Sequence, residues 1–293
     1  MTEVALGVVQ CSAVTLDPEA NAAGSSERIR RAVAAGASLV VLPELVATSY
    51  YASRDRLMPI AESVGDPGPC LSAWAATARE LGVTVVAGFA ERDGDRLFNS
   101  AVVIDSRGSF VEVYRKLHLF GVEHRAFSPG DRGLPVMDVD GLRLGVLVCY
   151  DLRFPETVRI MALRGAEVIA VPTAWVGGFD RTVPPDGRIG QVDGALVQCN
   201  LNQVFMACAD QVGTTGSVSF LGRSVVINPF GQALAGPLSP VDEDIVVVPI
   251  DTEDVERARH RGPGIDPMEN RRTDVYDAML GYTEPTSSSP LGG

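Results

Sequence analysis

The sequence predicts an α/β fold with a mixed sheet, on three observations. Helical and strand patterns alternate along the whole chain of 293 residues, which favours one α/β unit. Two short runs, residues 39–42 and 168–171, are continuously apolar, as in strands buried on both faces. No segment rich in Pro, Gly and Ser divides the chain internally, so we expect a single domain over residues 1–281. The composition then turns to Pro, Ser, Thr and Gly, which predicts a flexible tail over residues 282–293.

The chain begins with a strand pattern at residues 4–10. Asp17-Pro18-Glu19 then predicts a helix start, because it supplies an N-cap, a proline at the first helical position and an acidic first turn. This helix is expected to stop at Gly36, before the buried strand that ends at Pro-Glu.

A second helix is expected over residues 69–81, closed by Gly82, with a strand at residues 83–88. Two further apolar runs, residues 97–104 and 109–114, flank the turn sequence Asp-Ser-Arg-Gly. Apolar runs around such a turn predict an antiparallel hairpin, and this pair makes the expected sheet mixed.

In the second half, an apolar run at residues 144–148 ends in Cys149, and Pro155 begins a helical pattern. Later strands are expected at residues 168–171, 204–209, 224–227 and 245–250, with a helix after Asp251. The order helix, Gly-Ala, buried strand, proline occurs twice, ending at Pro43 and Pro172. It indicates either two related halves or a coincidence of pattern.

Composition excludes several classes of function. The formal net charge of −12 argues against a nucleic-acid partner, which needs a basic face. No apolar run approaches the roughly 20 residues that cross a bilayer, and the N-terminus lacks a signal-peptide pattern. We therefore expect a cytoplasmic protein without a membrane partner. Five widely spaced cysteines without CxxC, and three histidines without HExxH, predict no disulfide framework, no metal and no cofactor.

Cys149 is the first candidate catalytic residue. It stands where a buried strand turns into a helix, and a helix N-terminus or a nearby cation there would lower the pKa of its thiol and favour the nucleophilic thiolate. The alternative is a small buried hydrophobe, the usual role of a free cysteine.

Glu44 and Lys116 are the next candidates. Glu44 directly follows a buried strand, where partial burial would raise its pKa and suit it to move protons; a surface or helix-capping carboxylate is the alternative. Lys116 is bracketed by apolar residues, so it is expected to point into a cleft and hold a developing oxyanion. The neighbouring Arg115 is expected to face solvent.

Three segments in this order resemble the nitrilase superfamily of carbon–nitrogen hydrolases: Pro-Glu-Leu at residues 43–45, Arg-Lys-Leu-His-Leu at 115–119, and Cys-Tyr-Asp-Leu-Arg-Phe-Pro-Glu at 149–156. Supporting likenesses are Pro-Thr-Ala-Trp at 172–175, Asn-Gln-Val-Phe at 202–205, and Gly-Arg-Ser at 222–224 with Asn-Pro-Phe-Gly at 228–231. The resemblance implies a four-layer α-β-β-α sandwich with two mixed β-sheets. It also implies a homodimer or higher homo-oligomer, for which residues 254–261 and 271–276 are candidate contacts.

The resemblance also assigns roles. Glu44, Lys116 and Cys149 match the family's Glu-Lys-Cys triad, and Glu123 fits the place of a second glutamate; the alternative for Glu123 is an ordinary loop carboxylate. The thiolate of Cys149 would attack an amide, with the oxyanion held by Lys116 and the backbone N–H of Tyr150.

Residues around this triad are given supporting roles. Tyr50, Trp175 and Phe120 are candidate pocket walls, although core packing would explain them equally well. Arg153 and Glu156 are expected to form a salt bridge or cap at the helix start, and Asp151 to bond the backbone of its own turn.

The activity expected is hydrolysis of a small aliphatic carboxamide to acid and ammonia, through a cysteine thioester. N-carbamoyl amino acids, the ω-amides of dicarboxylic acids and nitriles are alternative substrates on the same triad. The first two carry a carboxylate, for which Arg181 and Arg188 are candidate partners unless they are surface residues. A catalytically silent binding module and a thiol redox protein are the other classes, the latter disfavoured by the lack of a resolving CxxC.

Overall fold

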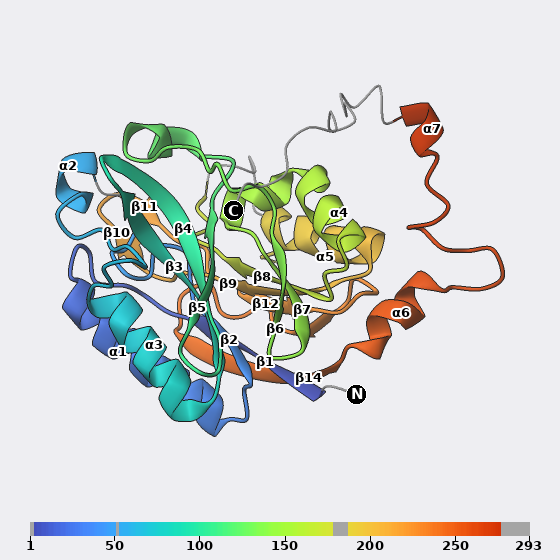
Figure 1. The fold of residues 1–293 in the computed structure, drawn as a ribbon, viewed down its shortest axis with the longest axis horizontal. Helices are drawn as coiled ribbons and strands as arrows, with labels where there is room; N and C mark the ends of the chain where they lie inside the picture. The colour runs from blue at the N-terminus through green and yellow to red at the C-terminus, as the bar shows by residue number, and fades with distance from the viewer. Residues whose placement is uncertain (1–2, 51–52, 178–186, 277–293) are drawn as a thin grey trace, which may run out of the picture.

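The computed structural model describes residues 3–50, 53–177 and 187–276. Its centre consists of two six-stranded sheets, with α1 (Pro18–Ala34) and α3 (Pro69–Leu81) on one side and α4 (Pro155–Leu163) and α5 (Gly190–Asn202) on the other (Figure 1). The predicted α-β-β-α sandwich with two mixed sheets is therefore confirmed. The predicted tail at residues 282–293 lies outside the described residues.

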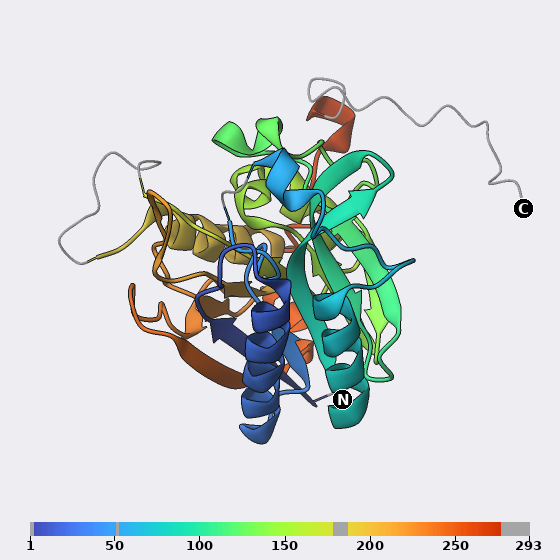
Figure 2. The same ribbon diagram turned by 90° about the vertical axis from the view of Figure 1, so that its left-hand side faces the viewer.

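The first sheet has the order β14-β1-β2-β3-β4-β5. Its strands are β14 (Asp244–Asp251), β1 (Glu3–Gln10), β2 (Leu39–Val41), β3 (Thr84–Asp93), β4 (Arg96–Ile104) and β5 (Phe110–Arg115). β1, β2 and β3 run parallel, whereas β14, β4 and β5 each join antiparallel. α1 and α3 lie side by side on its outer face (Figure 2), where Ile29 and Trp74 are fully buried against the strands.

The second sheet has the order β13-β12-β9-β8-β7-β6. Its strands are β13 (Ala233–Ala235), β12 (Val225–Ile227), β9 (Phe205–Ala209), β8 (Val168–Pro172), β7 (Leu142–Val146) and β6 (Val136–Val139). β7, β8 and β9 are parallel and the flanking strands antiparallel. Read from its β13 edge, the second sheet has the same order of strand directions as the first sheet read from its β5 edge, so β8 corresponds to β2. This correspondence supports the two related halves that the repeated pattern indicated.

Between the two sheets lies one continuous apolar core, in which the facing strand residues are fully buried, for example Leu6, Val86, Leu144 and Ala207. The shorter elements surround this core: α2 (Arg54–Leu57), η1 (Gly121–Arg125), η2 (Cys149–Arg153), β10 (Thr214–Thr215), β11 (Val218–Ser219), α6 (Glu253–Arg259) and α7 (Thr273–Tyr276). α7 projects away from the sandwich (Figure 1). Within the described ranges, no helix combines the length and apolarity needed to cross a membrane.

The predicted elements are present, with two kinds of difference. β3 runs to Asp93, five residues beyond the predicted end at Gly88, because the chain continues as the long antiparallel pair with β4. α5 was not predicted, since its thirteen residues contain two glycines and two asparagines and have no clear apolar stripe.

Candidate active site

Glu44 and Lys116, 72 residues apart in the chain, are joined in the protein interior. The ammonium Nζ of Lys116 lies 2.7 Å from Oε1 of Glu44, and both side chains are 0% exposed. Glu44 follows the end of β2, and Lys116 follows the end of β5. The structure thus places both at strand ends and buries the lysine.

Two glycines permit this convergence by letting backbones pass closely. A Cβ on Gly88 of β3 would lie 2.5 Å from the backbone nitrogen of Leu45 and 2.6 Å from Cα of Glu44. A Cβ on Gly130 would lie 2.1 Å from the carbonyl oxygen of Arg115. Only glycine fits at such distances, so both sites hold the segments that carry the triad residues.

Glu123 is the second carboxylate on the same lysine. Its Oε1 lies 2.8 Å from Lys116 Nζ and accepts the hydroxyl hydrogen of Tyr50 at 2.6 Å. Its Oε2 accepts the backbone N–H of Phe120 at 3.0 Å, which fixes the side chain at the start of η1. The structure therefore brings Glu123 into the cluster, as expected, and ties it to the candidate pocket wall Tyr50.

Cys149 is the first residue of η2 and follows the end of β7 by three residues. Its backbone is left-handed, with a φ of 47°. Left-handed conformations are strained for residues with a side chain and occur most often where function requires them. Its thiol interacts electrostatically with Glu44, Lys116 and Glu123, so the sulfur lies in the same cluster.

The thiol is held in its protonated form. Burial raises the pKa of Cys149 well above its usual value, and the Glu44 carboxylate adds to the rise, while Lys116 and the backbone N–H of Ala174 oppose it. The expectation of a lowered thiol pKa was wrong, because burial and the Glu44 carboxylate outweigh the lowering effect of the nearby Lys116 cation. A base is therefore needed to make the nucleophile.

Glu44 has the properties of that base. Burial raises its pKa, and the Glu123 carboxylate raises it further, against the opposing effects of Lys116 and of a hydrogen bond from Asn99. Burial alone would lower the pKa of Lys116, but Glu44, Glu123 and Cys149 together raise it, so the lysine stays cationic. The cluster thus combines a fixed cation, a basic carboxylate and a neutral thiol.

A cavity opens over Cys149, with about 490 Å³ of empty space when the part open to solvent is included. Its walls include the three aromatic residues predicted to line a pocket, Tyr50, Phe120 and Trp175. Tyr150, Arg153 and Gln191 also line it. Arg188 does not line this cavity and instead lies 3.0 Å from Asp193, and Arg181 lies outside the described residues. In the part of the chain that the structure describes, no three His, Cys, Asp or Glu side chains are arranged to hold a metal.

Comparison with known proteins matches residues 5–260 to the carbon–nitrogen hydrolase family model. This chain belongs to the carbon–nitrogen hydrolase family. It is 36% identical over 274 residues to a nitrilase of Pyrococcus abyssi, covering 93% of this chain and 99% of that one. It is 30% identical to the chloroplastic omega-amidase of Arabidopsis thaliana, covering 95% of this chain and 75% of that one. A solved glutamate-to-glutamine variant of an amidase from Nesterenkonia sp. AN1, with acrylamide joined to its active-site cysteine by Michael addition, superposes with a TM-score of 0.75 and 28% identity, covering 94% of this chain and 100% of that one. The predictions of a nitrilase superfamily member and of a carbon–nitrogen hydrolase are confirmed.

In this hydrolase, the two sheets meet at the site. The backbone N–H of Glu44 donates to the carbonyl of Thr173, 3.2 Å away at the end of β8, and Gln211 Nε2 donates to the carbonyl of Glu44 at 2.7 Å. The ends of β2, β8 and β9 are thereby fastened together. The sequence placed Gln211 in the segment Gln-Val-Gly at 211–213, which resembles the family, but assigned it no role, because a side chain that bonds only main chain carries no chemical signal of its own.

Asn99 was also missed. Its Nδ2 donates to Oε1 of Glu44 at 2.7 Å, and its own side chain is fully buried in β4. A signal was present, because Asn99 and Ser100 are the only polar residues in the apolar run at residues 97–104. A buried polar residue within an apolar strand needs a partner, and here the partner is the candidate base.

Asp151 fixes the turn that carries Cys149. Its Oδ2 accepts the backbone N–H of Val148 at 3.2 Å, as expected for a bond within the turn, and also the Tyr114 hydroxyl at 2.7 Å. Its Oδ1 lies 2.8 Å from Nδ1 of His118, whose ring stacks on Phe154 with centroids 3.5 Å apart. The turn is thus anchored to the segment that follows Lys116. Glu156 is exposed in the first turn of α4.

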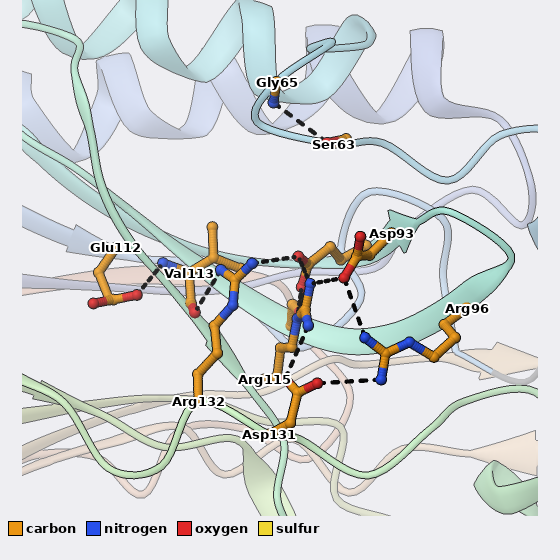
Figure 3. Close-up of polar contacts among 11 residues, drawn as sticks. Ser63, Gly65, Asp93, Arg96, Glu112, Val113, Arg115, Asp131 and Arg132 are labelled. Carbon is orange, nitrogen blue, oxygen red and sulfur yellow. Dashed lines mark hydrogen bonds and ion pairs between the residues drawn. The ribbon is translucent and has the colours of Figure 1, made fainter. Parts of the chain in front are cut away.

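Arg115 corrects one prediction, since it is buried and does not face solvent. Its guanidinium donates to Glu91 at 2.7 Å, Asp93 at 2.9 Å and Asp131 at 2.8 Å, and only 3% of the side chain is exposed. Figure 3 shows Arg115 among Asp93, Asp131 and the further cations Arg96 and Arg132. The guanidinium also lies 3.8 Å from the ring centroid of Phe98. Adjacent residues of a strand point to opposite sides, so Arg115 is buried behind the strand while Lys116 enters the site.

Proposed function

We propose that this chain is an amidase that hydrolyses small neutral aliphatic carboxamides to carboxylic acid and ammonia. One observation carries the proposal: a buried ammonium, Lys116, is held between Glu44 and Glu123 beside a neutral thiol, under a cavity with aromatic walls. Such a set can stabilise an oxyanion, move a proton and form a covalent intermediate without any further group.

The first step makes the nucleophile. Oε2 of Glu44 is buried and has no hydrogen-bond partner among the described residues, so it is the oxygen that accepts the thiol proton of Cys149. The thiolate then attacks the carbonyl carbon of the amide, and the carbonyl oxygen becomes an oxyanion. Glu44 now holds the proton that the leaving nitrogen requires.

Lys116 stabilises the oxyanion. An ammonium has three N–H donors, and two of them are used on Glu44 and Glu123. The third is directed to the oxyanion, together with the backbone N–H of Tyr150, which follows Cys149. Because the lysine is already oriented by two carboxylates in a dry site, little reorganisation is needed when charge develops.

Collapse of the tetrahedral intermediate breaks the C–N bond. Glu44 gives its proton to the nitrogen, ammonia leaves, and a thioester remains on Cys149. A water molecule then gives a proton to Glu44 and attacks the thioester. A second collapse releases the acid and returns the proton to the sulfur, which restores the resting state.

The cavity favours a small neutral substrate. Its walls are mainly aromatic and apolar, which suits an uncharged substrate better than a charged one. A nucleophilic cysteine is supported by the glutamate-to-glutamine variant of the Nesterenkonia amidase, in which the active-site cysteine has added to acrylamide by Michael addition.

A second candidate substrate is an amide that also carries a carboxylate. Arg153 lines the cavity and would place a guanidinium near such a group. The omega-amidase relative adds weight to this alternative. Arg188 no longer supports it, because it lies away from the cavity.

An ammonia-release screen decides between these substrates. Propionamide, propionitrile, succinamic acid and N-carbamoyl-β-alanine are compared at equal concentration, with Cys149→Ala as the control. We expect propionamide to be turned over best, with loss of turnover in the variant and an acyl adduct on Cys149 by intact mass spectrometry. Preference for succinamic acid, or full activity of Cys149→Ala, would contradict the proposal.

We further propose that residues 1–281 act as one catalytic domain that forms a homodimer in the cytoplasm. Exposed apolar side chains on the outer helices, Leu163 of α4 and Val197 and Leu201 of α5, support association. All five cysteines are unpaired, as is usual in a reducing compartment. Light scattering after size-exclusion chromatography tests the dimer, and a mass of 31.0 kDa would contradict it.

A further inference from the structure

Strand β4 divides two neighbouring polar residues between two different clusters. Ser100 Oγ donates to Oε2 of Glu91 at 2.7 Å, and Glu91 belongs to the cluster around Arg115. Asn99 points the other way and donates to Glu44. Successive side chains of a strand alternate between its faces, so this separation follows directly from the pleat. Both residues are fully buried, which makes them a matched pair for experiment.

Asn99 contacts the site twice. Its amide Nδ2 lies 2.7 Å from Oε1 of Glu44, and its backbone carbonyl accepts the N–H of Lys116 at 2.9 Å. The same residue therefore fixes the side chain of the carboxylate and the main chain of the lysine. Removing the side chain leaves the second contact intact, so the effect of the first can be measured alone.

The hydrogen bonds of Glu44 are unequal. Oε1 accepts from both Lys116 Nζ and Asn99 Nδ2, whereas Oε2 is buried and accepts from no described residue. Two donors on one oxygen define the rotation of the carboxyl group. Without Asn99, the group could turn about its terminal torsion and offer either oxygen to Lys116, because this torsion is broad.

Packing alone does not account for an asparagine here. Its Oδ1 is also buried without a partner in the described part of the chain, so the amide makes one side-chain hydrogen bond in all. A half-satisfied buried amide costs stability relative to an apolar residue of similar volume. An asparagine is therefore explained by its hydrogen bond to Glu44 and not by its contribution to stability.

We propose that Asn99 is a positioning residue for the hydrolytic reaction: it holds Oε1 of Glu44 so that Oε2 faces the thiol of Cys149 as the proton acceptor. The proposal rests on the proposed role of Glu44 as the base. It does not depend on which carbon–nitrogen substrate the enzyme uses.

The charged surroundings of Glu44 come from several elements. Lys116 follows β5, Glu123 belongs to η1, Cys149 begins η2 and Asp210 follows β9; each interacts electrostatically with Glu44. The Asn99 hydrogen bond favours the ionised carboxylate and so lowers the pKa of Glu44 against the effect of burial. Its removal must therefore raise that pKa.

The test compares Asn99→Ala, Asn99→Asp and the control Ser100→Ala, using pH profiles of kcat and kcat/KM for propionamide. For Asn99→Ala we expect kcat to fall by roughly tenfold or more, KM to change little, and the acid limb of kcat/KM to move up by about one pH unit. Asn99→Asp should move the limb further, because a second carboxyl on Glu44 disfavours its ionisation. Ser100→Ala should lower Tm but leave the limb in place.

Two outcomes would overturn the proposal. One is a wild-type acid limb in both Asn99 variants; the other is an equal shift in Ser100→Ala. Should Asn99→Ala not fold, Asn99→Leu takes its place, because it keeps a similar volume and removes the hydrogen bond to Glu44 without adding a charge. If the wild-type enzyme leaves propionamide intact but hydrolyses the nitrile or the N-carbamoyl compound, the proposed amidase function fails. The same profiles, taken with that substrate, still test Asn99.

Discussion

Lys116 binds Glu123 and Glu44 at nearly the same distance, 2.8 Å and 2.7 Å, yet the two carboxylates are bonded differently. Both oxygens of Glu123 accept hydrogen bonds, from Lys116 and Tyr50 on Oε1 and from the backbone of Phe120 on Oε2. Glu44 keeps one oxygen without a partner among the described residues. Under the proposed mechanism the two carboxylates of this site have different tasks: Glu123 orients the lysine, and Glu44 moves the proton.

Replacing Glu123 by glutamine tests this division. Loss of its charge weakens the hold on Lys116, so we expect kcat to fall by roughly a hundredfold, as for a lost oxyanion donor. The Glu123 carboxylate raises the pKa of Glu44, so its removal should move the acid limb of kcat/KM to lower pH. This direction is opposite to that expected for Asn99→Ala.

Tyr50→Phe is the matched control for Glu123→Gln. It removes the hydroxyl that donates to Glu123 but preserves both the carboxylate charge and the aromatic wall. The acid limb should therefore stay near its wild-type position, with a smaller fall in kcat. A limb that rises in Glu123→Gln would show that Glu123 does not act on Glu44 through its charge.

The residues at strand ends could be predicted from the sequence, and those inside strands could not. Glu44, Lys116 and Cys149 each follow an apolar run, and the family resemblance of their segments joined them into one site, although β2 and β5 are not neighbours and β7 belongs to the other sheet. Asn99 lies in the middle of an apolar run, where its only signal is its polarity. Which carboxylate it would meet depends on how β2 and β4 are placed in the sheet, and a single sequence does not contain that information.

The prediction for Arg115 failed for a related reason. A single charged residue is usually solvated, and its three partners come from separate parts of the chain: Glu91 and Asp93 near the end of β3, and Asp131 in a later loop. Strand alternation could have shown that Arg115 and Lys116 face opposite ways. It could not have shown that both sides are buried.

The Arg115 cluster should contribute to stability more than to chemistry. Arg115→Met would leave Glu91, only 5% exposed, with the longer Arg132 contact at 3.5 Å as its remaining ion pair among the described residues, and breaking the main pair of a buried charge costs up to about 3–5 kcal/mol. We expect this loss in the free energy of unfolding measured with urea. The double variant Arg115→Met, Glu91→Gln should recover part of it, because no lone charge remains. An equal loss in both variants would show that packing, and not charge, is what Arg115 supplies.

Asp210 predicts a pH-dependent change in stability. It is fully buried at the end of β9, where Oδ1 accepts from Thr173 Oγ1 at 2.9 Å and from the Trp175 backbone at 2.7 Å. Burial raises its pKa well above the usual value. As pH rises from the unfolded pKa towards this raised folded pKa, the unfolded state loses its proton first, so the folded state loses stability across that window.

Asp210→Asn cannot ionise and keeps the accepting oxygen. Its Tm relative to wild type should therefore increase as pH rises through the window, whereas the other titrating groups cancel in the comparison. Thr173→Val removes one bond to Asp210 without changing any titratable group, and its Tm difference should be nearly independent of pH. A pH-independent difference for Asp210→Asn would mean that Asp210 is ionised in the folded protein.

Gly194 predicts where substrate length is limited. It lies in α5 and lines the cavity over Cys149, and a Cβ at this position would meet no described atom within 4 Å. A larger side chain at this position can therefore enter the cavity over Cys149, where the proposed function places the acyl group of the substrate. Gly194→Val should lower kcat/KM for butyramide by roughly tenfold or more relative to acetamide, because filling a pocket by one or two methylenes changes selectivity by that order.

The control for Gly194→Val is Val197→Ala, one turn further along α5, where the side chain is 55% exposed. It should leave the ratio of the two amides unchanged. Gly194→Ala should itself raise Tm, because a helical glycine costs about 1 kcal/mol relative to alanine, and it should reduce butyramide turnover less than valine does. If both Gly194 variants hydrolyse the two amides in the wild-type ratio, the acyl group does not lie against α5, and the cavity over Cys149 must be entered from the side of Phe120 and Tyr150.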